Sequence, residues 1–161
     1  MPEGTVTVSR TIEAPAAKLF GLLIHSANHP LIDGSGMLRE APSDIVLSGV
    51  GDVFTMKMHN DEMGYYEMAN HIIEYEPDRR IGWEPVLKPA SREEDQASIG
   101  DPAHHRWSFE LTPTGPQTTL VTETYDCTGS PEWLRKATKG GTRWTASMTA
   151  TLEKLDALSS A

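Results

Sequence analysis

Residues 5–23 read TVTVSRTIEAPAAKLFGLL, and their apolar side chains change from an alternating to a helical spacing. In the alternating part, one face carries Val6, Val8 and Ile12. This spacing predicts a strand with one buried face. Pro15 then suits the first turn of a helix, whose apolar stripe is formed by Leu19, Phe20, Leu22 and Leu23. We therefore expect a strand followed at once by a short helix that ends before Pro30.

The middle of the chain has the spacing of strands joined by turns. Stretches typical of strands occur at residues 37–40, 52–59, 65–76, 80–84, 105–113 and 118–126. The residues between most of them include Gly, Pro, Asn and Asp, which favour reversing connections. This order predicts an antiparallel meander. Residues 85–104 differ, because this stretch is long, polar and interrupted by proline and glycine, and we interpret it as a candidate gate.

The C-terminal part of the chain returns to helical spacing. Its apolar stripe consists of Trp133, Ala137, Gly141, Trp144, Met148, Leu152 and Leu155. Burial of a large apolar side chain contributes about 1.5 to 3 kcal/mol, so we expect this helix to lie against the sheet. Ser130 and Pro131 are typical of the cap and the first residue of such a helix. The adjacent Gly140 and Gly141 predict a kink or a division into two helices.

Composition limits the class of protein. The chain has 161 residues, of which 38% are apolar, so we expect one core and a single domain over residues 1–161. The net charge of -9 repels phosphate backbones and anionic lipids, so neither nucleic acid nor membrane insertion is expected. The absence of a basic leader and of an apolar run of about 20 residues predicts a cytoplasmic location. Cys127 has no partner cysteine and is interpreted as a small structural residue.

One motif has the spacing of a metal site. His25, His29 and Asp33 follow one another at intervals of four residues, so on one helix they share a face. However, serine follows the first histidine where a zincin helix has its catalytic glutamate, and proline follows the second. We therefore interpret residues 33–36, DGSG, as a turn whose aspartate accepts hydrogen bonds from backbone N–H groups. No metal and no cofactor is expected.

The order of these elements, and four stretches within it, resemble a known superfamily. The stretches are SRTIEAPAAKLFGLL (9–23), NHIIEYEPDRRIGWEP (70–85), TTLVTETYD (118–126) and MTATLEKLDAL (148–158). Together they resemble the helix-grip fold of the Bet v 1-like superfamily, also called START-like or SRPBCC, and its branch related to polyketide cyclases and dehydrases. The resemblance implies an α+β fold, in which a curved antiparallel sheet of about seven strands wraps around a long C-terminal helix and two short helices follow strand one. It also implies an internal cavity, which in many relatives holds a small apolar molecule.

Two strands contain polar residues in the phase of core residues. A charged side chain in an apolar interior has to be paired, hydrogen-bonded or functional. On the last strand, Val121, Glu123 and Tyr125 share one face, whereas Leu120 is the competing inward residue and leaves the glutamate in solvent. The strand at 65–76 is ambiguous as well. In one phase, the inward residues are Glu67, His71 and Tyr75. In the other phase, they are Tyr66, Met68 and Asn70. A bulge would allow a mixture of the two phases.

The candidate site follows from these phases. Glu123 and Tyr125 are the candidate catalytic pair. The candidate ligand-binding residues are Trp83, Trp107, Phe109, Val121, Trp144, Met148, Asn70 and His71. The three tryptophans suit a flat apolar ligand, although tryptophans at such positions are also typical of a core. The adjacent His104 and His105 are interpreted as a solvated pair at a loop end.

Two functions from different classes remain open. The first is a protein, monomeric or homodimeric, that binds a small apolar molecule in an internal cavity with one or two orienting polar groups. The second is an enzyme in which Glu123 as base and Tyr125 as proton donor promote an aldol-type cyclisation or a dehydration of a polyketide-like or aromatic substrate. An interaction domain without a ligand is a third reading and predicts a filled interior. We prefer the first, because the sequence shows no compact set of acid and base residues.

Overall fold

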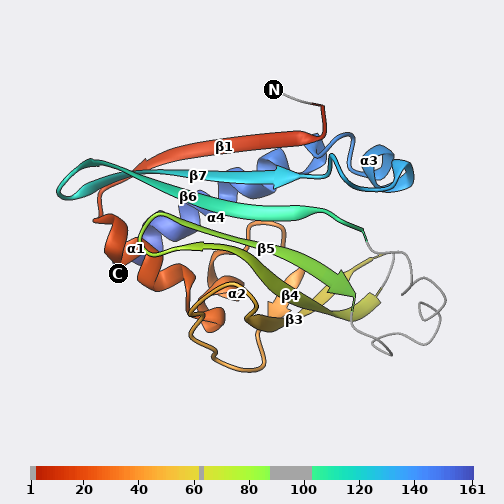
Figure 1. Ribbon diagram of the computed structural model, residues 1–161, viewed down its shortest axis with the longest axis horizontal. Helices are drawn as coiled ribbons and strands as arrows, with labels where there is room; N and C mark the ends of the chain where they lie inside the picture. Colours follow the sequence, from red (N-terminus) through yellow and green to blue (C-terminus); the bar gives the residue numbers. More distant parts are fainter. Residues whose placement is uncertain (1–2, 62–63, 88–102) are drawn as a thin grey trace.

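A computed structural model describes residues 3–61, 64–87 and 103–161. Within these residues, the strands form one 7-stranded antiparallel sheet in the order β1-β7-β6-β5-β4-β3-β2 (Figure 1). The strands are β1 Thr5–Ile12, β2 Leu38–Glu40, β3 Val53–Asn60, β4 Gly64–Glu76, β5 Arg80–Leu87, β6 Arg106–Gly115 and β7 Thr118–Asp126. Strands β2 to β7 follow one another as neighbours, and β1 pairs with β7 at the edge. The predicted meander is confirmed.

Helices lie on one face of this sheet and beside its end. They are α1 Ala16–Leu23, α2 His29–Ile32, α3 Glu132–Ala137 and α4 Thr145–Ser159, with 3-10 helices η1 Ser26–Asn28 and η3 Thr142–Trp144. In Figure 1, α4 runs behind β7 and β6. Its residues buried against the sheet include Met148, Leu152 and Leu155. These elements confirm the expected α+β helix-grip fold, with short helices after β1. Within the described ranges, no helix has both the length and the apolar character that a bilayer-crossing segment requires.

Two glycines divide the C-terminal helical region. Lys139, Gly140 and Gly141 all have positive φ angles, of 53°, 67° and 92°, so the chain turns between α3 and η3. A Cβ atom on Gly141 would also lie 2.8 Å from the ring of Tyr125. The predicted division is confirmed, but the predicted continuous stripe is wrong at its start. Trp133, on α3, is turned away from the core and is 57% exposed.

The start of α3 corrects a second detail. The residue before the helix is Pro131, which makes no side-chain cap bond. The hydroxyl of Ser130 is buried and has no hydrogen-bond partner in the part of the chain that the structure describes. Ser130 therefore does not cap the helix as expected. Most of the candidate gate at 85–104 lies outside the described residues.

Two apolar clusters fill the space between α4 and the sheet. The larger, here called the main core, includes Phe54, Trp83, Phe109, Val121 and Leu152. The smaller, here called the end cluster, consists of Val6, Tyr125, Cys127 and Met148. Trp107 and Trp144 pack against the end cluster. The complete burial of Cys127 agrees with its interpretation as a small structural residue.

Candidate ligand-binding site

Strand β7 alternates between buried and half-buried side chains. Its buried residues are Thr119, Val121, Glu123 and Tyr125. Leu120 is only half-buried, so the valine phase is the one that faces the interior. Glu123 and Tyr125 therefore point together toward the space below α4, which is the inward alternative of the sequence analysis.

Glu123 lies at the junction of the two apolar clusters. Along its own strand it is flanked by Val121 of the main core and Tyr125 of the end cluster. Its register partners on the neighbouring strands are Phe109 of β6 and Val8 of β1. The residue is 4% exposed, and its Oε1 atom has no hydrogen-bond partner among the described residues. A buried polar atom without a partner is costly, which marks this carboxyl group as a candidate binding group.

The surroundings of Glu123 keep its proton bound. Burial, and to a smaller extent the negative charge of Asp33, raise the pKa of Glu123 to about 8. The carboxyl group is therefore mainly neutral at pH 7. Burial also raises the pKa of Tyr66, to which the charge of Asp33 again contributes. Asp33, which follows α2, is thus an electrostatic neighbour of the interior that sequence reasoning assigned only to a turn.

Tyr125 is buried and forms a hydrogen bond with His105, for which the sequence predicts a solvated position. Its hydroxyl lies 2.8 Å from Nδ1 of His105. Burial lowers the pKa of His105 to about 4 and raises the pKa of Tyr125, so both groups are neutral at physiological pH. The interpretation of His105 as a solvated residue is wrong. The missed signal is its phase, because His105 lies two residues before Trp107 and four before Phe109.

Aromatic rings surround the Tyr125 side chain. The ring centroid of Trp107 lies 4.5 Å from that of Tyr125, and the centroid of Trp144 lies 6.3 Å from it. The two indole rings are 6.2 Å apart. The Nε1 atom of Trp144 is buried. Met148 completes this wall from α4. The predicted ligand-binding residues Trp107, Trp144 and Met148 therefore lie together.

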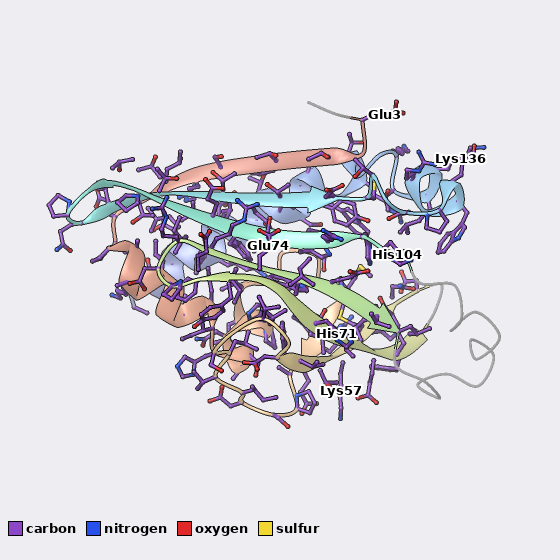
Figure 2. The ribbon with its side chains drawn as sticks, in the orientation of Figure 1. Glu3, Lys57, His71, Glu74, His104 and Lys136 are labelled. Atoms are coloured by element: carbon purple, nitrogen blue, oxygen red, sulfur yellow. The ribbon has the colours of Figure 1, made fainter. Side chains whose placement is uncertain are left out.

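Strand β4 combines both expected phases through a bulge. Before the bulge, Tyr66, Asn70 and Ile72 are buried, and Asn70 donates a hydrogen bond to the backbone oxygen of Phe54. The register shifts between Ile72 and Glu74, after which Tyr75 packs edge-on against Phe20. His71, labelled in Figure 2, is exposed. Its assignment beside Asn70 as an interior residue is therefore corrected.

The remaining predicted ligand-binding residues, Trp83, Phe109 and Val121, belong to the main core. Trp83 lies between aromatic neighbours, with ring centroids 5.9 Å from Phe109 and 5.3 Å from His29. His29 is buried and bonds through Nε2 to the backbone oxygen of Leu23 at 2.8 Å. Trp83 and His29 are thus structural neighbours of the site, whereas Phe109 also lies beside Glu123.

The residues of the four-residue motif do not converge. His25 is half-buried, with Nδ1 3.7 Å from a carboxylate oxygen of Asp44. His29 is used in the main core. The carboxylate of Asp33 accepts hydrogen bonds from the backbone N–H groups of Ser35 and Leu38, as expected for a turn. No group of three or more potential metal ligands occurs among the described residues.

Two hollows lined by described residues lie at the surface. One, of about 410 Å³, is bordered by α3 and the chain before β1, and the other, of about 430 Å³, by residues around His104 and Arg106. Neither is lined by Glu123, Tyr125 or a residue of α4. Glu123 itself lies between the two clusters, away from both hollows. The internal cavity implied by the resemblance stays a prediction.

The antiparallel sheet, with α4 against one face, defines a protein of the helix-grip class. Residues 13–158 match the family model described as Activator of Hsp90 ATPase homolog 1-like protein. The chain therefore belongs to this family, which is part of the SRPBCC/Bet v 1-like superfamily. The superfamily expected from the sequence is confirmed. Its fold is typical of proteins that bind small ligands.

Two curated relatives come from Mycobacterium tuberculosis. Uncharacterized protein Rv0088 of strain H37Rv is 30% identical over 128 residues, which cover 76% of this chain and 48% of the relative. Uncharacterized protein MT0096 of strain CDC 1551 is 32% identical over 128 residues, with the same coverage. The chain thus spans about half the length of the curated relatives that it matches.

Solved structures with the same fold include proteins of different organisms. Protein CV1439 of Chromobacterium violaceum has a TM-score of 0.64 at 16% identity, over 98% of this chain and 97% of that one. A protein of Arthrobacter aurescens has a TM-score of 0.71 at 13% identity, over 98% and 87%. A norcoclaurine synthase mutant of Thalictrum, in complex with a transition-state analogue, has a TM-score of 0.62 at 12% identity, over 96% and 92%. At these identities the likeness establishes the fold alone.

Proposed function

We propose that this protein binds a small, largely apolar molecule between α4 and the sheet, with Glu123 as the polar group that orients it. The observation that carries the proposal is a carboxyl group that is 4% exposed and has an oxygen without a partner among the described residues. Binding sites for small molecules combine apolar walls with a few such polar groups. The aromatic rings of Trp107 and Tyr125 supply an apolar wall next to it.

A ligand between α4 and the sheet would lie against side chains of the two clusters. The glycine turn at 140–141 lies just before η3 and α4, so it is a natural place for the helix to move relative to β7. A ligand at a hundredfold excess over its Kd stabilises a protein by about 2.7 kcal/mol, which a thermal scan detects readily. An interaction domain that binds no ligand would show no such stabilisation.

The test uses tryptophol, a neutral indole alcohol, and isothermal titration calorimetry. We expect the wild-type protein to bind it and to melt at a higher temperature in its presence. Glu123→Gln should weaken this binding by less than about tenfold, because an amide retains hydrogen bonding, whereas Glu123→Leu should weaken it by more. Glu153→Gln is the matched control, because Glu153 is exposed on α4. Failure of tryptophol and of related indoles of either charge to bind would refute the proposal.

A second candidate function is acid–base catalysis in a cyclisation or dehydration, as in the sequence analysis. It is favoured by the pKa of Glu123, about 8, which lets this group exchange a proton near physiological pH. Tyr125 remains protonated and can donate a hydrogen bond. If Glu123 catalyses, Glu123→Gln should leave substrate affinity nearly unchanged and lower turnover by about a hundredfold or more. If Glu123 only binds the ligand, Glu123→Gln should lower the affinity and leave turnover unchanged.

A further inference from the structure

The interior holds acidic groups without a basic partner among the described residues. Glu123 points into it, and Asp33 acts on it through its negative charge. Among the described residues, no lysine or arginine is buried. The half-buried Arg80 is bonded to Glu74, labelled in Figure 2, and to Glu110, in the strand phase opposite to the buried Ile81. Residues 3–61, 64–87 and 103–161 therefore bring no buried lysine or arginine to Glu123.

The histidines do not supply this charge either. His29 is bonded to the backbone oxygen of Leu23, and burial lowers its pKa. His105 is bonded to Tyr125, and burial lowers its pKa to about 4. Lys154, on the exposed side of α4, donates to the backbone oxygen of Asp33 and not to its carboxylate. Apart from the exposed side chains, the ionisable groups around Glu123 among the described residues are thus Asp33, His29, Tyr66, His105, Tyr125 and Cys127. None of them is a cation at pH 7.

Aromatic rings lie next to Glu123 in the end cluster and the residues packed against it. Trp107 and Tyr125 lie with centroids 4.5 Å apart, and Trp144 lies 6.2 Å from Trp107. The faces of such rings attract cations, and the attraction increases when water is excluded. A buried carboxyl group beside a set of aromatic rings is the chemistry that recognises an organic cation.

We infer that the ligand is an amine: a small molecule with an apolar body and a protonated nitrogen, which pairs with the Glu123 carboxylate while the body packs on Trp107 and Tyr125. The inference rests on the proposed function and names its ligand class. A neutral molecule leaves the negative potential of the interior uncompensated, and a carboxylate adds to it.

The proton balance distinguishes an amine from a neutral ligand. At pH 7 Glu123 of the free protein holds a proton, because its pKa is about 8. An alkylamine, with a pKa near that of lysine at about 10.4, arrives protonated. Pairing needs the carboxylate, so Glu123 loses its proton to solvent, and about one proton is released for each amine bound. A neutral ligand that accepts a hydrogen bond from the acid releases none.

The pH dependence has a defined sign. The affinity for the amine should rise by about tenfold per pH unit up to pH 8, where Glu123 ionises by itself, and then level off until the amine loses its own proton. The affinity for a neutral acceptor should be flat below pH 8 and fall above it.

The experiment compares three ligands with one ring system: tryptamine as the cation, tryptophol as the neutral analogue and indolepropionate as the anion. Calorimetry in buffers of different ionisation enthalpy gives the affinity and the number of protons released, which should be about one per tryptamine at pH 7 and about half of one at pH 8, where Glu123 is half-ionised. For the wild-type protein at pH 8, tryptamine should bind at least about tenfold more tightly than tryptophol. Indolepropionate should bind least.

Variants locate the effect. Glu123→Gln should lower the affinity for tryptamine by about tenfold or more, abolish the proton release and change the affinity for tryptophol less. Glu153→Gln should change neither. Equal or tighter binding of tryptophol or indolepropionate, or binding of tryptamine without proton release, would overturn the amine inference while the proposed function stands. Absence of binding of all three would remove both. The proton count on the wild-type protein needs no variant, so it decides the matter even if Glu123→Gln does not fold.

Discussion

The hydroxyl of Tyr125 and Nδ1 of His105 are 2.8 Å apart, and this bond joins the end of β7 to the residue just before β6. Because Nδ1 of His105 is shielded from water, it depends on the Tyr125 hydroxyl for its hydrogen bond. The pair therefore fixes the aromatic wall of the candidate site.

Tyr125→Phe should reduce the free energy of unfolding by about 1 kcal/mol, because His105 loses its partner inside the protein. Urea denaturation followed by circular dichroism measures the change. Tyr65→Phe is the matched control, because Tyr65 is 72% exposed, and it should be neutral. Equal effects of the two substitutions would show that the bond contributes nothing.

The stability of the protein should decrease as the pH rises from about 6.5 to about 8. The folded protein holds a proton on Glu123 up to a pKa of about 8, whereas the unfolded chain releases it near the ordinary value of 4.5. Unfolding therefore releases a proton in this range, and each pH unit costs up to about 1.4 kcal/mol. Denaturation at a series of pH values measures the slope.

Below pH 6.5 the histidines act in the opposite direction. The pKa of His105 is lowered to about 4, so its unfolded form takes up a proton as the pH falls from 6.5, which favours unfolding. The window above 6.5 isolates Glu123. Glu123→Gln should flatten the slope there, and a slope unchanged by this substitution would assign it to another group.

Gly34→Ala should destabilise the protein by about 1 to 3 kcal/mol or more, because the added methyl group has no room. Its Cβ would overlap the backbone oxygen of Ser147 and lie 2.7 Å from the backbone nitrogen of Thr151, both on α4. The turn that holds Asp33 is thus seated directly on this helix. Gly49→Ala, where no atom lies within 4 Å, is the control and should be neutral within about 0.5 kcal/mol.

The two histidines of the four-residue motif should differ in their effect on stability. His29→Ala removes a side chain that is 4% exposed and packs on Phe54 and Trp83, so it should cost about 2 kcal/mol or more. His25→Ala removes a half-buried side chain whose ion-pair partner Asp44 is largely in solvent, and it should cost less than about 0.5 kcal/mol. Thermal denaturation of both variants measures the difference. If both substitutions cost the same free energy of unfolding, the claim that His29 is structural and His25 is not would be wrong.

Sequence periodicity predicted the order of strands and helices and the common face of Glu123 and Tyr125, although it left open which face of β7 points inward. It failed where the backbone departs from a regular repeat. The alternation of Val121, Glu123 and Tyr125 predicts their common face. On β4, the bulge after Ile72 changes the phase within one strand, and no period of two describes both halves. In the C-terminal part, the left-handed Gly140 and Gly141 separate Trp133 from the stripe of α4.

The polar part of the site was less predictable for a physical reason. The burial of His105 depends on the packing of Tyr125, which lies 20 residues away in the chain. The influence of Asp33 on Glu123 passes through space between a turn after α2 and a strand near the other end of the sequence. Such relationships arise from tertiary structure, whereas the phase of a single strand does not contain them.

The measurement that tests the central claim most directly is the titration of the Glu123 side-chain carboxyl carbon by NMR, in the free protein and with saturating tryptamine. The account predicts a midpoint near pH 8 in the free protein and a resonance that stays in the ionised position at pH 7 when tryptamine is bound. A midpoint near the ordinary value of 4.5, with a resonance that no indole ligand shifts, would contradict it.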